Sequence, residues 1–317
     1  MQQNINQLKQ WLASKIVGQD HLVERLIIAL LADGHLLVEG APGLAKTKAI
    51  KTLSEGIEAD FHRVQFTPDL LPADITGSDI YRPQEGTFEF QAGPLFHNLV
   101  LADEINRAPA KVQSALLEAM AERQISVGKN TYQLPELFLV MATQNPIEQE
   151  GTYSLPEAQM DRFLMHRLVD YPAPETERQI LALSRQEALD QAQETIEKIS
   201  QATLLEARKQ ALAVHMAEPV EEYLVQLILA TRNTQAYDGA LAQWLDYGAS
   251  PRATIALDRC SRALAWLEGR DFVTPDDVRA VAHDVLRPRL ILSFEAEASG
   301  VTANQVIDKL LATVPSA

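Results

Sequence analysis

Short apolar runs alternate with helical segments through the first half of the chain. Runs of this length, bounded by polar residues, are typical of strands that are buried on both faces. Their alternation with helices predicts an α/β fold, in which a mostly parallel sheet is covered by helices on both faces. The strands that we expect are His35–Glu39, His62–Phe66, Leu99–Asp103, Phe138–Thr143 and Phe163–Asp170.

Two segments interrupt this alternation. Asp79–Gly93 combines Pro and Gly with short aromatic alternation, which predicts a hairpin rather than a helix. Ile125–Leu134, with Gly128-Lys129-Asn130 at its centre, predicts a second hairpin. The alternative is that both hairpins lie on the surface and have no functional role.

The pattern changes after Tyr171-Pro172-Ala173-Pro174, where two prolines break the chain. The remainder of the chain is almost all helix-forming sequence. Pro219 begins one helix, and Thr274-Pro275-Asp276-Asp277 begins another, with Thr as the N-cap, Pro in the first position and acids in the first turn. We therefore expect two units: residues 1–173 with the sheet, and residues 174–317 as a connecting helix and an all-helical lid.

The first expected strand leads directly into Gly40-Ala41-Pro42-Gly43-Leu44-Ala45-Lys46-Thr47. This is a phosphate-binding loop in which Ala45 stands where the pattern has a second Gly. Between a strand and a helix, such a loop points backbone N–H groups at a polyphosphate. Lys46 would reach the β- and γ-phosphates, and the Thr47 hydroxyl would ligate magnesium. An ordinary strand-to-helix turn is the alternative.

Asp103 and Glu104 end the third expected strand. Ligands bind at the carboxyl ends of strands in open α/β sheets, so these two carboxylates are expected near the loop. Asp103 would hold magnesium through water, and Glu104 would polarise the water that attacks the γ-phosphate. An acidic strand end in solvent is the alternative, which is weak for a strand that comes after a phosphate loop.

At this point the chain resembles the AAA+ ATPases, and within them the MoxR family. The resemblance covers nearly the whole chain and implies a sheet order of five, one, four, three, two by chain position. It implies ATP and Mg²⁺ as cofactors, hydrolysis between subunits of a homo-hexameric ring, and chaperone-like remodelling of a protein client with a von Willebrand factor A domain protein. The two hairpins match the helix-2 insert and the pre-sensor-1 hairpin, which face the pore in such rings. Five ordered blocks carry the resemblance: Val38–Thr47, Phe66–Gly77, Asp103–Ala108, Ala142–Pro146 and Glu157–Phe163.

The resemblance also implies roles for four further residues. Asn145 would be the first sensor, which bonds the attacking water and the γ-phosphate, and Arg252 the second sensor. Arg162 would be the arginine finger that reaches the neighbouring subunit's nucleotide, with Arg107 as a second candidate at the interface. An Asn-Pro turn and surface arginines paired with nearby acids are the alternatives.

Two more assignments come from the same resemblance. Val17 and Gly18 belong to a stretch that such proteins place against the adenine, and Gln65 stands where related enzymes restrain the catalytic acid.

Composition limits the remaining alternatives. A net charge of -15 argues against generic nucleic-acid binding, which needs a basic face. A nucleic-acid motor related to the MCM helicases is still the second hypothesis, with Lys129 in its favour, and a nucleotide-gated scaffold is the third. No apolar run is long enough for membrane insertion, and Met1–Asn6 lacks the features of a signal peptide. The single cysteine, Cys260, is expected to be buried, and we expect a cytoplasmic protein.

Overall fold

The structure is a computed structural model that describes residues 1–147, 151–189 and 195–316. Five parallel strands form one sheet in the order β2-β5-β8-β1-β9. By chain position this is the implied order of five, one, four, three, two, which is confirmed. Every strand end lies within two residues of its expected position. The strands are β1 (Leu36–Gly40), β2 (Phe61–Gln65), β5 (Leu99–Asp103), β8 (Leu139–Gln144) and β9 (Met165–Val169).

Alternate residues of the central strands are buried on opposite faces of the sheet. In β5, Leu99 and Leu101 join one apolar cluster, and Val100 and Ala102 join the other. This period of two, apolar on both sides, is what a strand between two helical layers requires. One cluster contains residues of α1 (Gln2–Lys15), α2 (Asp20–Leu31) and α3 (Lys46–Gly56), and the other contains residues of α4 (Pro72–Thr76) and α5 (Ala110–Glu122).

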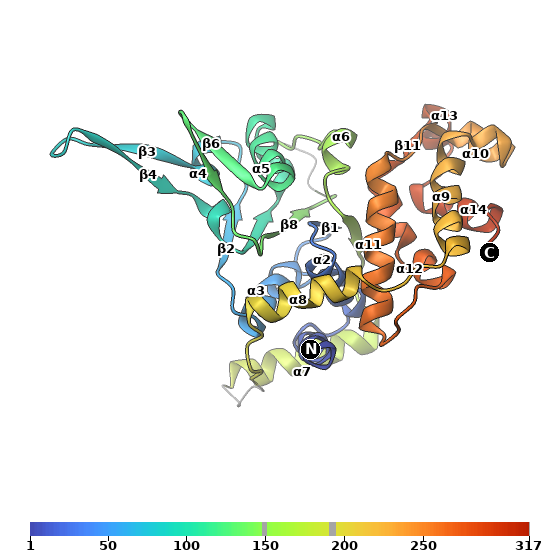
Figure 1. The fold of residues 1–317 in the computed structure, drawn as a ribbon, viewed down its shortest axis with the longest axis horizontal. Helices are drawn as coiled ribbons and strands as arrows, with labels where there is room; N and C mark the ends of the chain where they lie inside the picture. Colours follow the sequence, from blue (N-terminus) through green and yellow to red (C-terminus); the bar gives the residue numbers. More distant parts are fainter. Residues whose placement is uncertain (148–150, 190–194, 317) are drawn as a thin grey trace.

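Both expected hairpins are present. The first pairs β3 (Gly77–Arg82) with β4 (Thr87–Ala92), and it projects from one end of the molecule (Figure 1). The second pairs β6 (Gln124–Val127) with β7 (Asn130–Gln133). The rings of Phe90 and Tyr132 stack with centroids 3.9 Å apart and planes 13° apart, so the two hairpins contact each other.

The described part of the chain after β9 is mostly helical, as expected. Thr274 caps α12 in a reciprocal pair with Asp277, which confirms the predicted helix start. A two-stranded antiparallel sheet joins the segments before α11 and after α12, and strands this short leave no period in the sequence. The elements are α7 (Pro174–Ala188), α8 (Gln201–Leu212), α9 (Glu218–Arg232), α10 (Gly239–Trp244), β10 (Leu245–Tyr247), α11 (Pro251–Leu267), α12 (Pro275–Leu286), β11 (Ile291–Leu292), α13 (Phe294–Ala298) and α14 (Ala303–Thr313), with 3₁₀ turns at Pro94–Phe96, Ile105–Arg107, Thr234–Ala236 and Arg287–Arg289.

The expected division at residues 173 and 174 crosses a continuous apolar cluster. Residues of α8, α9, α11, α12 and α14 pack in the same cluster as α1 and α2. A buried ion pair of 2.7 Å between Arg25 of α2 and Asp284 of α12 adds a polar link. The division into 1–173 and 174–317 therefore remains a prediction, and residues 190–194 and 317 of the second unit lie outside the described residues.

Two smaller expectations concern single features. Cys260 is fully buried, as expected, and burial raises the pKa of its thiol to about 12. Of the helices that the structure describes, none is both long and apolar enough to span a membrane.

Candidate active site

The phosphate-binding loop lies at the carboxyl edge of the sheet, between the end of β1 and the first residue of α3. Residues from Pro42 to Lys48 line a hollow of about 410 Å³. Asp103, Glu104 and Asn145 line the same hollow from β5 and β8. The fold thus brings together residues from three separate parts of the chain, as the sequence predicted.

Ala45 has a backbone conformation that glycine adopts more easily. Its φ is 57° and its ψ is 14°, in the left-handed region. An L residue there costs roughly 1–2 kcal/mol, which explains why the usual pattern has Gly at this position. Ala45 nevertheless leads directly into α3, so the loop keeps the strand–loop–helix geometry that a phosphate site requires.

Lys46 is a buried cation at the mouth of the loop. It is 9% exposed, and its Nζ donates to the carbonyl oxygens of Gly40 and, at 3.3 Å, of Gln144. Burial lowers the pKa of its amine. Within the described part of the chain its hydrogen bonds go only to carbonyl groups, so the charge has no carboxylate in contact and is available to a phosphate.

Asp103 is held from two sides at the end of β5. One oxygen accepts a hydrogen bond of 2.6 Å from the Thr143 hydroxyl, and the other accepts bonds of 3.0 and 2.7 Å from the guanidinium of Arg63. Arg63 was not singled out from the sequence. The only available signal was that a basic residue lies in the strand that forms the edge of the sheet. Arg63 also donates to Gln65 at 2.9 Å, which connects Asp103 to the second carboxylate of the site.

Glu104 comes directly after Asp103, in a strained backbone conformation. Its φ of 57° is again left-handed, and its N–H donates to Thr143 Oγ1 at 2.9 Å. Its Oε2 accepts from the Gln65 amide at 2.7 Å and from Arg107 at 2.9 Å. Non-glycine residues in this region are uncommon and cluster at functional sites. The expected contact of Gln65 is present, and Arg107 pairs with Glu104 of its own chain.

Asn145 comes directly after β8 and is 6% exposed. Its Oδ1 accepts a hydrogen bond of 3.1 Å from the N–H of Ile147, so the residue does form the Asn-Pro turn that was considered as an alternative. It also lines the hollow beside Lys46 and Glu104, where a neutral amide can bond a phosphate oxygen or a water.

Comparison with known proteins identifies the family. A family model for the ATPase family associated with various cellular activities matches residues 35–165, and a model for the AAA lid domain matches residues 241–310. Chaperone MoxR1 of Mycobacterium tuberculosis is 47% identical over 94% of this chain and 78% of its own length. Protein MoxR of Paracoccus denitrificans is 34% identical over 95% of this chain and 92% of its own. The chain belongs to the MoxR family of AAA+ ATPases.

A solved structure agrees with this membership. The crystal structure of a protein assigned as an ATPase from Cytophaga hutchinsonii matches with a TM-score of 0.92 and 45% identity, over 100% of this chain and 96% of the other. This MoxR-family protein therefore binds and hydrolyses ATP, and the hollow at the phosphate loop is the candidate site for the nucleotide.

A second hollow of about 410 Å³ adjoins the phosphate loop on its other side, between the loop and α7. Apolar side chains form part of its wall, among them Val17, Ile180 and Leu183, and polar ones such as Lys48 and Glu187 complete it. Gly18 lies next to this wall with a φ of 81°, and an added Cβ would come within 2.2 Å of Thr176, so only glycine fits there. A slot with an apolar wall beside the loop suits a purine ring.

The side chains that would bind Mg²⁺ supply the oxygen ligands that this ion prefers. Mg²⁺ takes oxygen ligands and is commonly bound through one or two protein groups together with phosphates and waters. Thr47 and Asp103 supply a hydroxyl and a carboxylate on the same hollow. Asp103 is 8% exposed and its carboxylate already accepts charge-assisted bonds from Arg63, so a cation there would replace or join that guanidinium.

Arg162 and Arg252 lie elsewhere in this MoxR-family fold. Together they line a cleft of about 270 Å³, here called the arginine cleft, which includes Gly34, His35 and Leu164 but no residue of the phosphate loop. Those three residues immediately precede β1 and β9, so the cleft lies at the amino edge of the sheet. Strands of five residues are about 16 Å long, and the phosphate loop is at their other end.

Asp161 organises the arginine cleft. Its carboxylate accepts a hydrogen bond of 2.8 Å from Arg289 and another of 2.8 Å from the Ser250 hydroxyl, with Arg252 at 3.5 Å. Arg289 is 6% exposed, so this contact fixes the helical region to the sheet. The side chain of Arg162 has no ion pair or hydrogen bond within the described residues.

Proposed function

We propose that this MoxR-family ATPase hydrolyses ATP between neighbouring subunits of a homo-hexameric ring and uses the cycle to remodel a protein client. One observation carries the proposal. The phosphate loop and the arginine cleft lie at opposite edges of one sheet, so a nucleotide on the loop is out of reach of Arg162 of the same chain. A site that needs both must take them from two copies.

One copy binds the nucleotide. Lys46 neutralises the β- and γ-phosphates, and α3 offers its N-terminal N–H groups to them. Thr47 and Asp103 would hold Mg²⁺, which supplies charge neutralisation to the phosphates when bound. Val17 and the apolar wall of α7 would accept the adenine.

The same copy positions the attacking water. Glu104 accepts its proton, and the Asn145 amide bonds the water or the γ-phosphate without acting as a base. Within the single subunit Glu104 Oε2 is bonded to Gln65 and Arg107. These bonds hold one oxygen of the carboxylate until ATP and the neighbouring copy are in place.

The second copy supplies the arginine cleft. Arg162 stabilises the charge that develops on the transferred phosphoryl group, an effect of about 10³–10⁵ in rate where such fingers are known. Arg252 acts as the second sensor on the same phosphate. Because Arg252 begins α11, a change in the bound phosphate acts directly on the helical region, and Asp161 connects both Arg252 and Arg289 of that region to the sheet.

The hairpins are the parts that would contact the client. At the projecting hairpin Phe88 is 70% exposed and packs on Tyr81, which is 52% exposed. The relative from Mycobacterium tuberculosis is named a chaperone, which supports remodelling of proteins as the output. A von Willebrand factor A domain protein is the partner that we propose, and the cytoplasm, where ATP and Mg²⁺ are plentiful, is the proposed location.

A trapped variant tests this function. Glu104→Gln keeps the shape of the side chain and removes the base, so it should hold ATP and retain its client. We expect affinity purification of this variant with ATP to retain a defined protein set, including a von Willebrand factor A domain protein, that Lys46→Ala does not retain. Retention of single-stranded DNA in place of proteins would instead support the nucleic-acid motor.

A further inference from the structure

One face of α11 points two arginines into the arginine cleft. Arg252 and Arg259 are seven residues apart, which is about two helical turns and 10.5 Å along the axis. Ile255 and Ala256 lie between them, and all four line the cleft together with Arg162. Residues that are three, four and seven positions apart lie on the same face of a helix. Arg259 is therefore part of the same surface as the two arginines of the proposed function.

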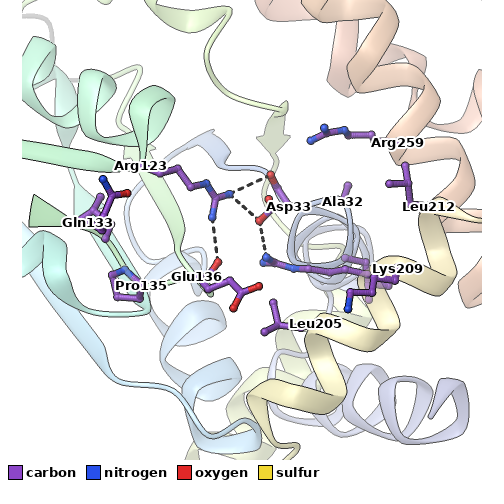
Figure 2. Close-up of a pocket in the computed structure, with 13 residues that line it drawn as sticks. Ala32, Asp33, Arg123, Gln133, Pro135, Glu136, Leu205, Lys209, Leu212 and Arg259 are labelled. Atoms are coloured by element: carbon purple, nitrogen blue, oxygen red, sulfur yellow. Dashed lines mark hydrogen bonds and ion pairs between the residues drawn. The ribbon is translucent and has the colours of Figure 1, made fainter.

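The cleft holds more positive than negative charge. Five arginines and two aspartates line it, and His35 is neutral because burial lowers its pKa to about 4. Both aspartates already have partners. Arg123 donates to Asp33 at 2.7 Å, as Figure 2 shows. Arg208 binds the same oxygen of Asp33, and Asp161 is bound by Arg289. The two carboxylates of the cleft therefore neutralise only part of its positive charge.

Arg259 carries part of this excess. Within the described residues its guanidinium forms no hydrogen bond or ion pair, and in Figure 2 no dashed line reaches it although Asp33 lines the same hollow. It lines both the arginine cleft and the adjoining hollow of about 480 Å³ that Figure 2 draws. In a chain of net charge -15, a cleft in which arginines outnumber acids is suited to an anion from outside the subunit.

We propose that Arg259 is a third arginine of the composite active site and contacts the triphosphate of ATP held by the neighbouring subunit. The inference rests on the proposed hydrolysis between subunits. Arg162 precedes β9, whereas Arg252 and Arg259 lie on one face of α11, so the three guanidiniums reach the cleft from two different elements. A triphosphate carries several charges and can accept bonds from all three at once.

Mixed rings of full-length chains test this assignment. An acceptor chain with Arg162→Ala keeps its phosphate loop, and a donor chain with Lys46→Ala keeps its arginine cleft. The mixture should hydrolyse ATP although neither chain does alone. Adding Arg259→Ala to the donor should lower this recovered turnover at least roughly tenfold, and Arg259→Lys should retain part of it. Adding Arg259→Ala to the acceptor should have little effect.

The matched control is Lys209→Ala in the donor. Lys209 is exposed and lines only the adjoining hollow, so its loss should leave the recovered turnover unchanged. Ring mass is measured in every mixture, at protein concentrations where assembly is complete.

The outcomes separate the two proposals. No recovery with the starting pair, in confirmed mixed rings, would remove hydrolysis between subunits and this inference with it. Recovery that is unaffected by Arg259→Ala in the donor would remove only the inference and leave Arg259 as a solvated surface arginine. A loss explained entirely by fewer rings would assign Arg259 to the neighbour's protein surface and would also overturn its contact with the nucleotide.

Discussion

The side-chain amide of Gln65 donates a hydrogen bond of 2.7 Å to the carboxylate of Glu104. The contact arises because β2 and β5 are parallel neighbours in a register that pairs Gln65 with Asp103. Arg107 binds the same oxygen of Glu104 at 2.9 Å. One oxygen of the proposed base is therefore held by two bonds within the single subunit, and we propose that this contact is a structural brake on basal hydrolysis.

Removing Gln65 should release this brake. We expect Gln65→Ala to raise basal ATP turnover severalfold, with unchanged ATP affinity, because Glu104 loses one of the two bonds that hold it. Turnover and nucleotide affinity are measured side by side, with Gln133→Ala on the second hairpin as the control. A fall in turnover at unchanged affinity would mean that Gln65 orients Glu104 for catalysis rather than restraining it.

Substitutions at Glu104 and at Lys46 should affect ATP hydrolysis and ATP binding separately. Glu104→Gln should bind ATP normally and lose about 10²–10⁴-fold in turnover, because the amide cannot accept the proton of the water. Lys46→Ala should weaken ATP binding itself, since the phosphates lose a buried charge. Isothermal titration and steady-state kinetics on both variants distinguish the roles. Wild-type turnover in Glu104→Gln would show that another group is the base.

Ala45→Gly should be tolerated. Glycine relieves a left-handed strain of roughly 1–2 kcal/mol but adds about 0.4–1 kcal/mol of chain entropy to the unfolded state. We expect a rise in Tm of at most about 3 °C, a modest change in ATP affinity and retained activity. Ala49→Gly inside α3 is the control and should lower Tm, because glycine is unfavourable in a helix interior. Loss of ATP binding in Ala45→Gly would refute the geometry of the loop.

His35 should make stability depend on pH. Its pKa is lowered from 6.5 to about 4, chiefly by burial and then by Arg123. Between these values the unfolded chain binds a proton that the folded chain does not, so stability falls as pH falls from 6.5 towards 4. The loss by pH 4.5 is about 2–3 kcal/mol.

Urea unfolding of the wild type and of His35→Gln at pH 7.5 and pH 4.5 checks this contribution. The glutamine variant lacks the titration, so the wild type should lose about 2–3 kcal/mol more than the variant on acidification. Equal losses in both proteins would contradict the assigned pKa.

Local patterns predicted much of this structure from the sequence. The strand positions, both hairpins, the phosphate loop and the Thr274 cap depend on neighbouring residues, so their signals are contained in short windows. The order of the strands in the sheet could not be predicted from such local patterns. Periodicity contains no information about which strands pair, and the order came from the resemblance to a known family.

Contacts between distant segments were harder to predict. Arg63 pairs with Asp103 across adjacent strands, so the contact exists only once the register of β2 and β5 is known. The left-handed backbone at Glu104 has no sequence signal, because the residue is neither Gly nor Asn. The arginine cleft likewise needed the fold, since Arg162 and Arg252 come together at the amino edge of the sheet.

The central claim is that ATP is hydrolysed between two copies of the chain, and the most direct measurement is turnover across mixing ratios of Arg162→Ala and Lys46→Ala chains. Each chain alone should be inactive. In mixed rings a productive interface pairs an intact loop with an intact Arg162, so activity should peak near equal amounts, where about one quarter of interfaces are productive. It should also rise with protein concentration as rings form. No recovery at any ratio, with mixed rings confirmed by mass, would contradict the account.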